Sequence, residues 1–449
     1  MATQRIPLAL GTEKIGKLLV QYATPAIIAM TASSLYNIVD SIFLGHGVGP
    51  LAISGLAISF PLMNVLAAFG SMVGVGATTL VSVKLGQKDY EGANKVLGNV
   101  VVLNAIIGIV MTFAFLLTLD PILYFFGASS ETIAYARDYM RIILYGNVIT
   151  HMYFGLNGVL RSSGFPKLAM YATLASVVIN TILNPIFIFG LGWGIKGSAI
   201  ATVIAQTISL VYQVIHFSNK QQLIHFREGI YRLEKDIVKG IISVGLSPFL
   251  MNLCSCLIVI LINRGLKQYG GDMAIGAYGI ANRVVFFFVM IIMGFNQGMQ
   301  PIAGYNYGAK QFDRVMAVTK LTMYYATAIA TLGFVLCEFM PVYIVRMFTD
   351  YPELISASVF GLRIDMAVFP IIGFQMVSTN FFTSIGMAKK AIFLSLTRQM
   401  LFLVPGLIIL PPLLGTFGVW LSIPIADAAA VVVTSVVFIR QIQKFKAIQ

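Results

Sequence analysis

Charge is the scarcest property of this sequence. Only 10% of the 449 residues are Asp, Glu, Lys or Arg, whereas 58% are hydrophobic and the mean hydropathy is +0.87. So little polar surface cannot cover a soluble globule of this size, and we therefore expect an integral membrane protein. The alternating ten-residue strands of an outer-membrane barrel are also absent, which leaves an all-α membrane fold.

Motifs of ATP-driven proteins and of hydrolytic enzymes are missing as well. The sequence has no Gly-x-x-x-x-Gly-Lys-Ser/Thr loop, so ATP is not the energy source within this chain. It has neither His-Glu-x-x-His nor Gly-x-Ser-x-Gly, which argues against an intramembrane enzyme. The cysteines Cys254, Cys256 and Cys337 fall in apolar stretches, where packing is commoner than metal or redox chemistry. We therefore expect no enzymatic activity and no cofactor.

Apolar runs of about 20 residues or more predict twelve transmembrane helices. Their approximate spans are residues 16–44, 51–81, 94–119, 132–158, 168–190, 195–217, 236–266, 274–304, 313–339, 356–383, 390–410 and 416–440. Several of these runs are longer than a bilayer requires, so tilted or extended helix ends are expected.

The net charge of +13 follows a membrane topology and does not indicate a nucleic-acid partner. Seven segments that would share one side of the membrane hold 21 of the 30 Lys and Arg residues, and the opposite loops hold four. By the positive-inside rule, both termini are expected in the cytoplasm. The first 17 residues lack a small-residue cleavage site after a short apolar core, so no removable signal peptide is expected.

The sequence also carries an internal duplication at an offset of 222 residues. The matches are Ala52 with Ala274, Ile53 with Ile275, Ile58 with Ile280, Gly86 with Gly308, Lys88 with Lys310, Ser162 with Ser384, Gly164 with Gly386, and Lys167 with Lys389. Each half has six helices, so the two repeats are parallel. We expect an N-lobe at residues 1–217, a cytoplasmic linker at 218–235 and a C-lobe at 236–449, with a central cavity between the lobes. A duplication without transport is the alternative.

Asp40 is the most informative single residue. It lies near the end of an apolar run, from about Leu18 to Leu44, that contains no basic residue. An unpaired charge at the centre of a bilayer costs roughly 2.5–3.5 kcal/mol or more, and a proton or Na⁺ would relieve that cost. A carboxyl group in this position therefore indicates ion binding or proton transport. A carboxylate that reaches water is the structural alternative.

Four charged residues lie well inside predicted helices of the C-lobe. They are Arg283, Asp365, Arg398 and Asp427. Two are positive and two are negative, so the lobe can be neutral if they pair. We expect Arg398 to pair with Asp427 or Asp365, because a lone buried charge is strongly destabilising. A purely structural network and a direct role in transport both stay open.

Three local patterns resemble those of the multidrug and toxic-compound extrusion (MATE) transporters. They are VDSIFLG at residues 39–45, NTILNP at residues 180–185, and the segment from Gln297 to Ala309 with QGMQP and GYNYGA. With the twelve helices and the repeat, the resemblance covers nearly the whole chain. Within the family, the chain looks like the DinF-type branch, whose coupling acid is on the first helix, and like its MepA-like bacterial members.

This resemblance implies a polar ion-coupling cluster around the acid of the first helix. By pattern, its members are Asp40, Tyr36, Asn157, Asn180, Asn184 and Thr202. It also implies bending of the first helix at Pro25, where a proline frees a backbone carbonyl. The chain departs from the family pattern at Asn184, because an aspartate often precedes the proline there. The loss of that carboxylate favours protons, although a Na⁺ site at Asp40, Asn180, Asn184 and Thr202 stays workable.

The resemblance does not extend to the acids of the sister branch, which lie in helices 7 and 10. Helix 7 has no acid after Asp236, and the helix 10 position falls near Phe374 or Gln375. Asp365 therefore does not inherit that role.

Taken with the resemblance, the sequence predicts an ion-coupled antiporter, with protons favoured over Na⁺ as the coupling ion. It would export organic compounds such as lipophilic cationic drugs across the bacterial cytoplasmic (inner) membrane by alternating access. The expected partners are a small organic substrate and the lipid bilayer, and the expected state is a monomer. The alternatives are a lipid-linked precursor flippase of a related fold, or a membrane enzyme or scaffold without transport.

Overall fold

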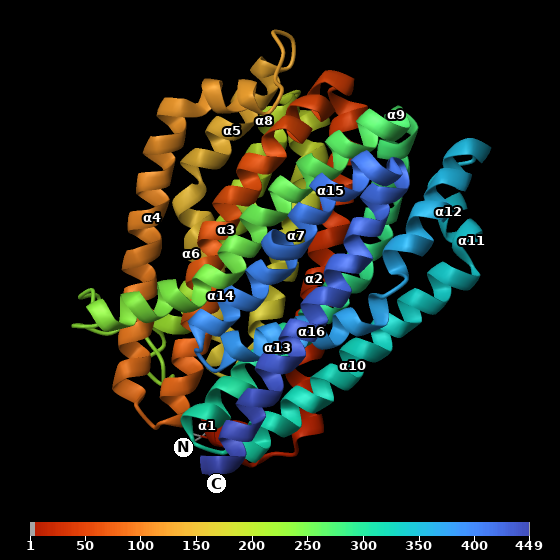
Figure 1. The fold of residues 1–449 in the computed structure, drawn as a ribbon. Coiled ribbons are helices and arrows are strands. Elements are labelled where there is room, and N and C mark those ends of the chain that lie inside the picture. The colour runs from red at the N-terminus through yellow and green to blue at the C-terminus, as the bar shows by residue number, and fades with distance from the viewer. Residues whose placement is uncertain (1–4, 449) are drawn as a thin grey trace. The chain divides into compact units, whose positions relative to one another are not determined.

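The computed structural model describes residues 5–448, which are almost entirely helical and contain no strand (Figure 1). The helices are α1 (Arg5–Thr12), α2 (Ile15–Gly47), α3 (Pro50–Gly86), α4 (Tyr90–Phe125), α5 (Ile133–Tyr145), α6 (Asn147–Ser162), α7 (Pro166–Pro185), α8 (Gly194–Ser218), α9 (Lys235–Gly308), α10 (Phe312–Phe339), α11 (Pro341–Arg346), α12 (Pro352–Met366), α13 (Phe369–Ser384), α14 (Ala388–Leu396), α15 (Val404–Leu414) and α16 (Thr416–Ile448). Two π-helical segments, η1 (Ile186–Gly190) and η2 (Thr397–Leu403), continue α7 and α14.

These helices account for the twelve predicted spans. Within residues 5–448, nine helical stretches are long and apolar enough to cross a membrane. One of them, α9, has 74 residues and is interrupted at Gly271 (φ 67°, ψ −165°), so it contains two spans. A further span is formed by α12 and α13, which are bent by 51° at their junction. The helices α5 and α6, which meet at Gly146, cover the span predicted at residues 132–158. The prediction of an all-α, twelve-helix membrane protein is confirmed.

The chain forms two compact units. Among the described residues, unit 1 comprises 5–13, 28–249 and 304–310, and unit 2 comprises 14–27, 250–303 and 311–448. Unit 1 includes residues 304–310 of the C-terminal half, and unit 2 includes residues 14–27 of the N-terminal half. The boundaries of the N-lobe, linker and C-lobe therefore stay a prediction. The boundary within α2 falls between Ile27 and Ile28, two residues after Pro25.

Two glycines of the repeat allow close helix packing inside unit 1. A Cβ atom added to Gly86 would lie 1.9 Å from the carbonyl oxygen of Tyr305, and one added to Gly308 would lie 2.1 Å from that of Val83. Val83 and Tyr305 are themselves 222 residues apart, as Gly86 and Gly308 are. Equivalent residues therefore contact each other reciprocally, so the ends of α3 and α9 cross with local two-fold symmetry. Small residues that let helix backbones approach are typical of membrane helix interfaces.

The turns that follow these glycines repeat the same backbone conformation. Lys88 and Lys310 have φ values of 61° and 60°, and they are the non-glycine residues of the described chain with positive φ. A left-handed conformation is uncommon for such residues, so finding it at both equivalent positions supports the 222-residue register.

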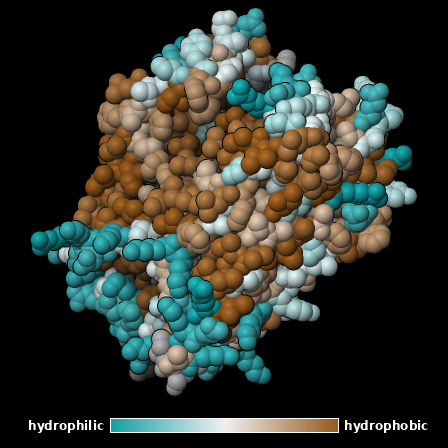
Figure 2. All heavy atoms as spheres, in the orientation of Figure 1, coloured by the Kyte–Doolittle hydropathy of each residue, from teal (hydrophilic) through white to brown (hydrophobic). Residues whose placement is uncertain are grey.

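Residues 219–234 connect α8 to α9 without regular structure. In Figure 2 the surface of α4 is largely hydrophobic, whereas the protruding part of residues 219–234 is hydrophilic. The exposed face of α4 carries large apolar side chains, including Phe113 and Leu117. A helix face of this composition is suited to lipid contact. The polar segment at its base is suited to water.

Candidate ion-coupling site

Asp40 is buried on α2, with 5% of its surface exposed. Leu44, one turn after Asp40, belongs to an apolar core cluster that also includes Ile188, Ile195 and Ala199. In the part of the chain that the structure describes, no Lys, Arg or His forms an ion pair with Asp40. The carboxyl group is therefore held in an apolar environment without a cationic partner.

Two neutral side chains donate hydrogen bonds to the same oxygen of Asp40. Asn184 donates from Nδ2 to Oδ1 at 2.7 Å, and Ser198 donates from Oγ to Oδ1 at 2.8 Å. Asn184 lies on the last turn of α7 and Ser198 on the first turns of α8, and both are fully buried. Because a carboxylate can accept about four hydrogen bonds, this arrangement leaves acceptor capacity for a proton or cation.

Thr202 links the remaining polar residues, one turn after Ser198 on α8. Its hydroxyl donates to the backbone carbonyl of Ser198 at 3.1 Å and accepts a hydrogen bond from Asn180 Nδ2 at 2.9 Å. Tyr36 Oη lies 3.3 Å from the same hydroxyl. Since Thr202 has one proton and gives it to Ser198, Tyr36 is the donor in this contact. Three helices thus contribute to one hydrogen-bonded network.

Two amide oxygens in this network lack a donor. Oδ1 of Asn180 and Oδ1 of Asn184 are buried without a hydrogen-bond partner in the described chain. Buried polar atoms normally find a partner, so such oxygens indicate a place for a proton donor or a cation. Hard cations such as Na⁺ prefer oxygen ligands of this kind.

Asn157, by contrast, bonds elsewhere. It lies on α6, and its Nδ2 donates to the carbonyl of Ala169 at 3.0 Å and approaches Thr173 Oγ1 at 3.5 Å. In the described chain it therefore connects α6 to α7 without a hydrogen bond to the Asp40 network. Pro25 lies within α2, which continues as a helix through it.

Ser198 is the member of the network that sequence reasoning missed. A serine in an apolar helix usually bonds to its own backbone, so its presence alone carries little signal. The available signal was its position four residues before Thr202, because residues at this spacing share one face of a helix.

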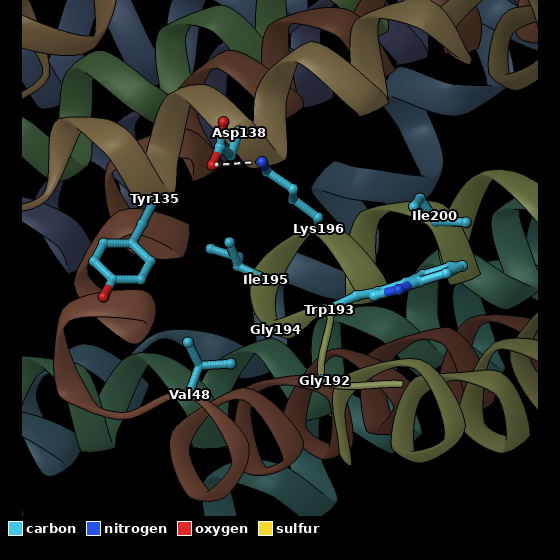
Figure 3. A pocket seen from close by; sticks show the side chains of 9 residues that line it. All are labelled: Val48, Tyr135, Asp138, Gly192, Trp193, Gly194, Ile195, Lys196 and Ile200. Atoms are coloured by element: carbon cyan, nitrogen blue, oxygen red, sulfur yellow. Dashed lines mark ion pairs between the residues drawn. The ribbon is translucent and has the colours of Figure 1, made fainter. Parts of the chain in front are cut away.

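A pocket of about 560 Å³ lies beside the start of α8 (Figure 3). Tyr135 and Trp193 line it from different elements, and Asp138 faces Lys196 across it in an ion pair of 3.2 Å. Its size is typical of small-molecule pockets. Ile195 also lines it, yet no residue of the Asp40 network does, so the pocket and the network are separate features of unit 1.

The C-lobe charges behave as the sequence predicts, with one exception. Arg398 Nε donates to Asp427 Oδ1, which confirms that Arg398 has an acidic partner. Asp365 is buried nearby and interacts electrostatically with both. Arg283 is exposed, and no ion pair is found for it among residues 5–448. The expectation that it is a buried charge is therefore wrong: residues 282 and 283 of α9 are both exposed, between two buried positions.

Comparison with known proteins identifies the family. The MatE family model matches residues 25–186 and 244–408, which is more than half of the chain. The chain belongs to the MATE family. Its relatives include the multidrug export protein MepA of Staphylococcus haemolyticus, 29% identical over 413 residues, and MepA of Staphylococcus aureus strain N315, 27% identical over 412 residues. Each alignment covers 92% of this chain and 91% of the relative.

Solved MATE structures share the fold. A MATE protein in a bent conformation superposes with a TM-score of 0.93, and an outward-facing multidrug resistance MATE transporter superposes with a TM-score of 0.91. A transporter of the MOP superfamily from Pyrococcus furiosus also gives a TM-score of 0.91. Each is 24% identical to this chain, and each alignment covers 98% of both chains. Family and fold together establish a multi-pass membrane transporter, not an enzyme.

Proposed function

We propose that this MATE protein exports organic compounds, chiefly lipophilic cations, across the bacterial cytoplasmic membrane in exchange for protons. The observation that carries the proposal is the buried Asp40 carboxyl group, held by Asn184 and Ser198 with no cationic partner in the described chain. Its relatives named as multidrug export proteins support the substrate class. The protein acts as a monomer with both termini in the cytoplasm, and it needs no cofactor.

The coupling follows from what one proton does to this network. The ionised carboxylate attracts both donors, and a protonated carboxyl group accepts more weakly and can itself donate a hydrogen bond. The Oδ1 atoms of Asn180 and Asn184, which have no hydrogen-bond partner in the described chain, supply acceptors for such a proton. A proton then biases alternating access to the extent that it binds one conformation more tightly than the other. A proton that crosses the full membrane potential contributes about 2.3 kcal/mol per 100 mV.

Sodium is the second candidate for the coupling ion, and it is favoured by the same two amide oxygens without a partner. Asp40, Asn180, Asn184 and Thr202 would supply one carboxylate, two amide oxygens and one hydroxyl. Only one of these ligands is charged, which is why we place the proton first. Asn184→Asp would add a second carboxylate, and we expect it to increase Na⁺ dependence.

The test is transport of a fluorescent cationic dye in inverted vesicles, energised separately by a proton gradient and by a Na⁺ gradient. We expect proton-driven export by the native protein and its loss in Asp40→Asn, which keeps the side-chain size but stays neutral. Asp120→Asn is the matched control, because Asp120 is a half-exposed acid that binds Arg137 away from the network. Export driven only by Na⁺ would select the second candidate. Undiminished export by well-inserted Asp40→Asn would contradict both, and vesicles that move a lipid-linked sugar but no dye would favour a flippase.

A further inference from the structure

Unit 2 contains three buried ionisable side chains that the proposed function does not use. Asp365 on α12 is 7% exposed, and Asp427 on α16 is 2% exposed. Arg398 on η2 is bonded through Nε to Asp427 Oδ1. Asp365 lies within electrostatic reach of both members of this pair. We call Asp365, Arg398 and Asp427 the Asp365 cluster.

The cluster has one more negative group than positive groups. Two carboxyl groups face a single guanidinium, and in the described chain Arg398 is the cation whose charge reaches Asp365. Asp365 also interacts electrostatically with Tyr278 on α9 and Cys337 on α10, but neither can supply a positive charge. Arg363, on the same helix as Asp365, instead donates to the backbone of Glu338. If both carboxyl groups were ionised, the cluster would carry an unmatched negative charge, which is unfavourable in a buried site.

The hydrogen bonds indicate where a neutralising proton would bind. Arg398 compensates the charge of Asp427 through the hydrogen bond between them. Asp365 has no hydrogen-bond donor in the described chain, and Asp427 Oδ2 is a buried acceptor without a partner. The cluster therefore contains one acid without a hydrogen-bond donor and one carboxylate oxygen without a partner. A metal ion is a poorer fit, because no group of three or more His, Cys, Asp or Glu side chains gathers in the described residues.

The duplicated fold does not require charges at these positions. In the N-terminal half, the residues 222 positions earlier are Ile143, Ser176 and Ala205. These three residues occupy the equivalent helices of unit 1 without a charge, so packing of the repeat is satisfied by small or apolar side chains. The charges in unit 2 are an addition to the fold. Arg398 also lies on a π-helical segment, a feature that is frequent at functional sites.

We propose that the Asp365 cluster binds one exchangeable proton, carried by Asp365 and balanced against the Arg398–Asp427 pair. Unit 2 then has a protonation site of its own, on different residues from the Asp40 network. A hydronium ion delivers the proton to Asp365 and leaves as water, so the cluster changes from a net charge of −1 to neutral. This inference does not depend on Asp40 being the coupling site.

The test measures protonated carboxyl groups by infrared spectroscopy of the purified protein at neutral pH. All variants carry Asp40→Asn, so that any signal from the N-terminal network is removed. We expect a carboxyl C=O band from a protonated acid in this background. Adding Asp365→Asn should remove the band, because the remaining acid and Arg398 then balance each other's charge without a proton. For the same reason, adding Asp427→Asn should also remove the band. Adding Glu338→Gln is the matched control and should leave the band unchanged.

The charge balance gives a second, opposite expectation. Arg398→Met removes the only cation of the cluster, so two carboxyl groups should then be protonated and the band should grow, whereas Arg398→Lys should leave it unchanged. A band that is absent from the Asp40→Asn background at every pH where the protein is folded would overturn the proposal. So would a band that Asp365→Asn removes and Asp427→Asn leaves intact, because burial of Asp365 alone would then explain it. If Arg398→Met does not fold, the two Asn variants still decide the question.

Discussion

The segment that links the two halves is held on α4 by two buried asparagines, and this attachment can be tested directly. Asn99 Nδ2 donates to the carbonyl of Arg232 at 3.1 Å, and its Oδ1 accepts from the amide of Glu234 at 2.9 Å. Asn94 makes the same pair of contacts with the carbonyl of Leu223 and the amide of His225, at 3.1 and 3.0 Å. Each asparagine therefore satisfies one donor and one acceptor of the linker backbone.

Asn99→Ala should loosen residues 230–234 without unfolding the protein. The substitution removes both linker contacts and a third bond to the carbonyl of Lys95. A net hydrogen bond contributes about 0.5–1.5 kcal/mol, and a buried group left without a partner costs about 1–3 kcal/mol. Arg232 is exposed and Glu234 is partly exposed, so water can replace part of what is lost. We therefore expect local opening to become easier by about 1–3 kcal/mol.

Hydrogen exchange measured by mass spectrometry can detect this change at the linker. A loss of about 1–3 kcal/mol corresponds to exchange that is about 5- to 150-fold faster, since about 1.4 kcal/mol is a factor of ten. Asn219→Ala is the matched control, because Asn219 accepts a single bond from Gln221 within the linker and is exposed. Unchanged exchange at Glu234 in Asn99→Ala, or an equal change in Asn219→Ala, would refute the assignment of Asn99 as an anchor.

Two further predictions concern the start of α4 and the Asp40 network. Asp89 caps α4 by accepting from the amide of Gly92 at 2.8 Å, and its hydrogen bond with Lys84 holds its pKa below the usual range. The contribution of Asp89 to stability is therefore present above the ordinary carboxyl range and is lost as the pH falls below about 4. Asp89→Ala should lower the unfolding free energy by about 0.5–2 kcal/mol at neutral pH in a denaturant titration. An equal loss in Asp89→Asn, which keeps the cap, would argue that the ion pair dominates. Ser198→Ala removes one of the two donors to Asp40, so the pH dependence of dye export should shift at unchanged protein level. Ser198→Thr keeps the hydroxyl and should retain native behaviour. An equal shift in Ser209→Ala, a buried serine of the same helix, would contradict a specific role of Ser198.

Hydropathy and spacing predict most of this fold, because the bilayer imposes simple lengths. The expected span at residues 168–190 corresponds to α7 and η1, residues 166–190, and the expected break after residue 217 corresponds to the end of α8 at Ser218. The 222-residue register also predicts which turns match, as Lys88 and Lys310 show. The π-helical segments could not be predicted, since they depend on local packing that leaves no clear composition signal.

The candidate site could be predicted in part. The structure brings Asp40, Asn180, Asn184 and Thr202 into one network, as the family resemblance implies. Asn157 lies outside this network. Its position could not be predicted, because hydropathy and pattern define a helix but not the direction in which each side chain leaves it. The same limitation explains the failure at Arg283, where a residue deep in an apolar run is exposed. Coupling ion and substrate stay predictions, since they depend on differences between conformations.

The duplication conserves packing in the two halves but separates their chemistry. The counterparts of Asp40, Asn184, Ser198 and Thr202 at the 222-residue offset are Ile262, Gly406, Trp420 and Pro424. In unit 2 the position of Ser198 is thus filled by Trp420, which packs so closely on Gly361 that an added Cβ would lie 2.2 Å from its ring. An apolar contact therefore occupies the place of the serine donor, an isoleucine occupies that of the acid, and the charges of unit 2 lie at other positions. Because neither polar network has an equivalent in the other half, neither can be explained by the symmetry of the fold, and each requires its own functional or structural cause.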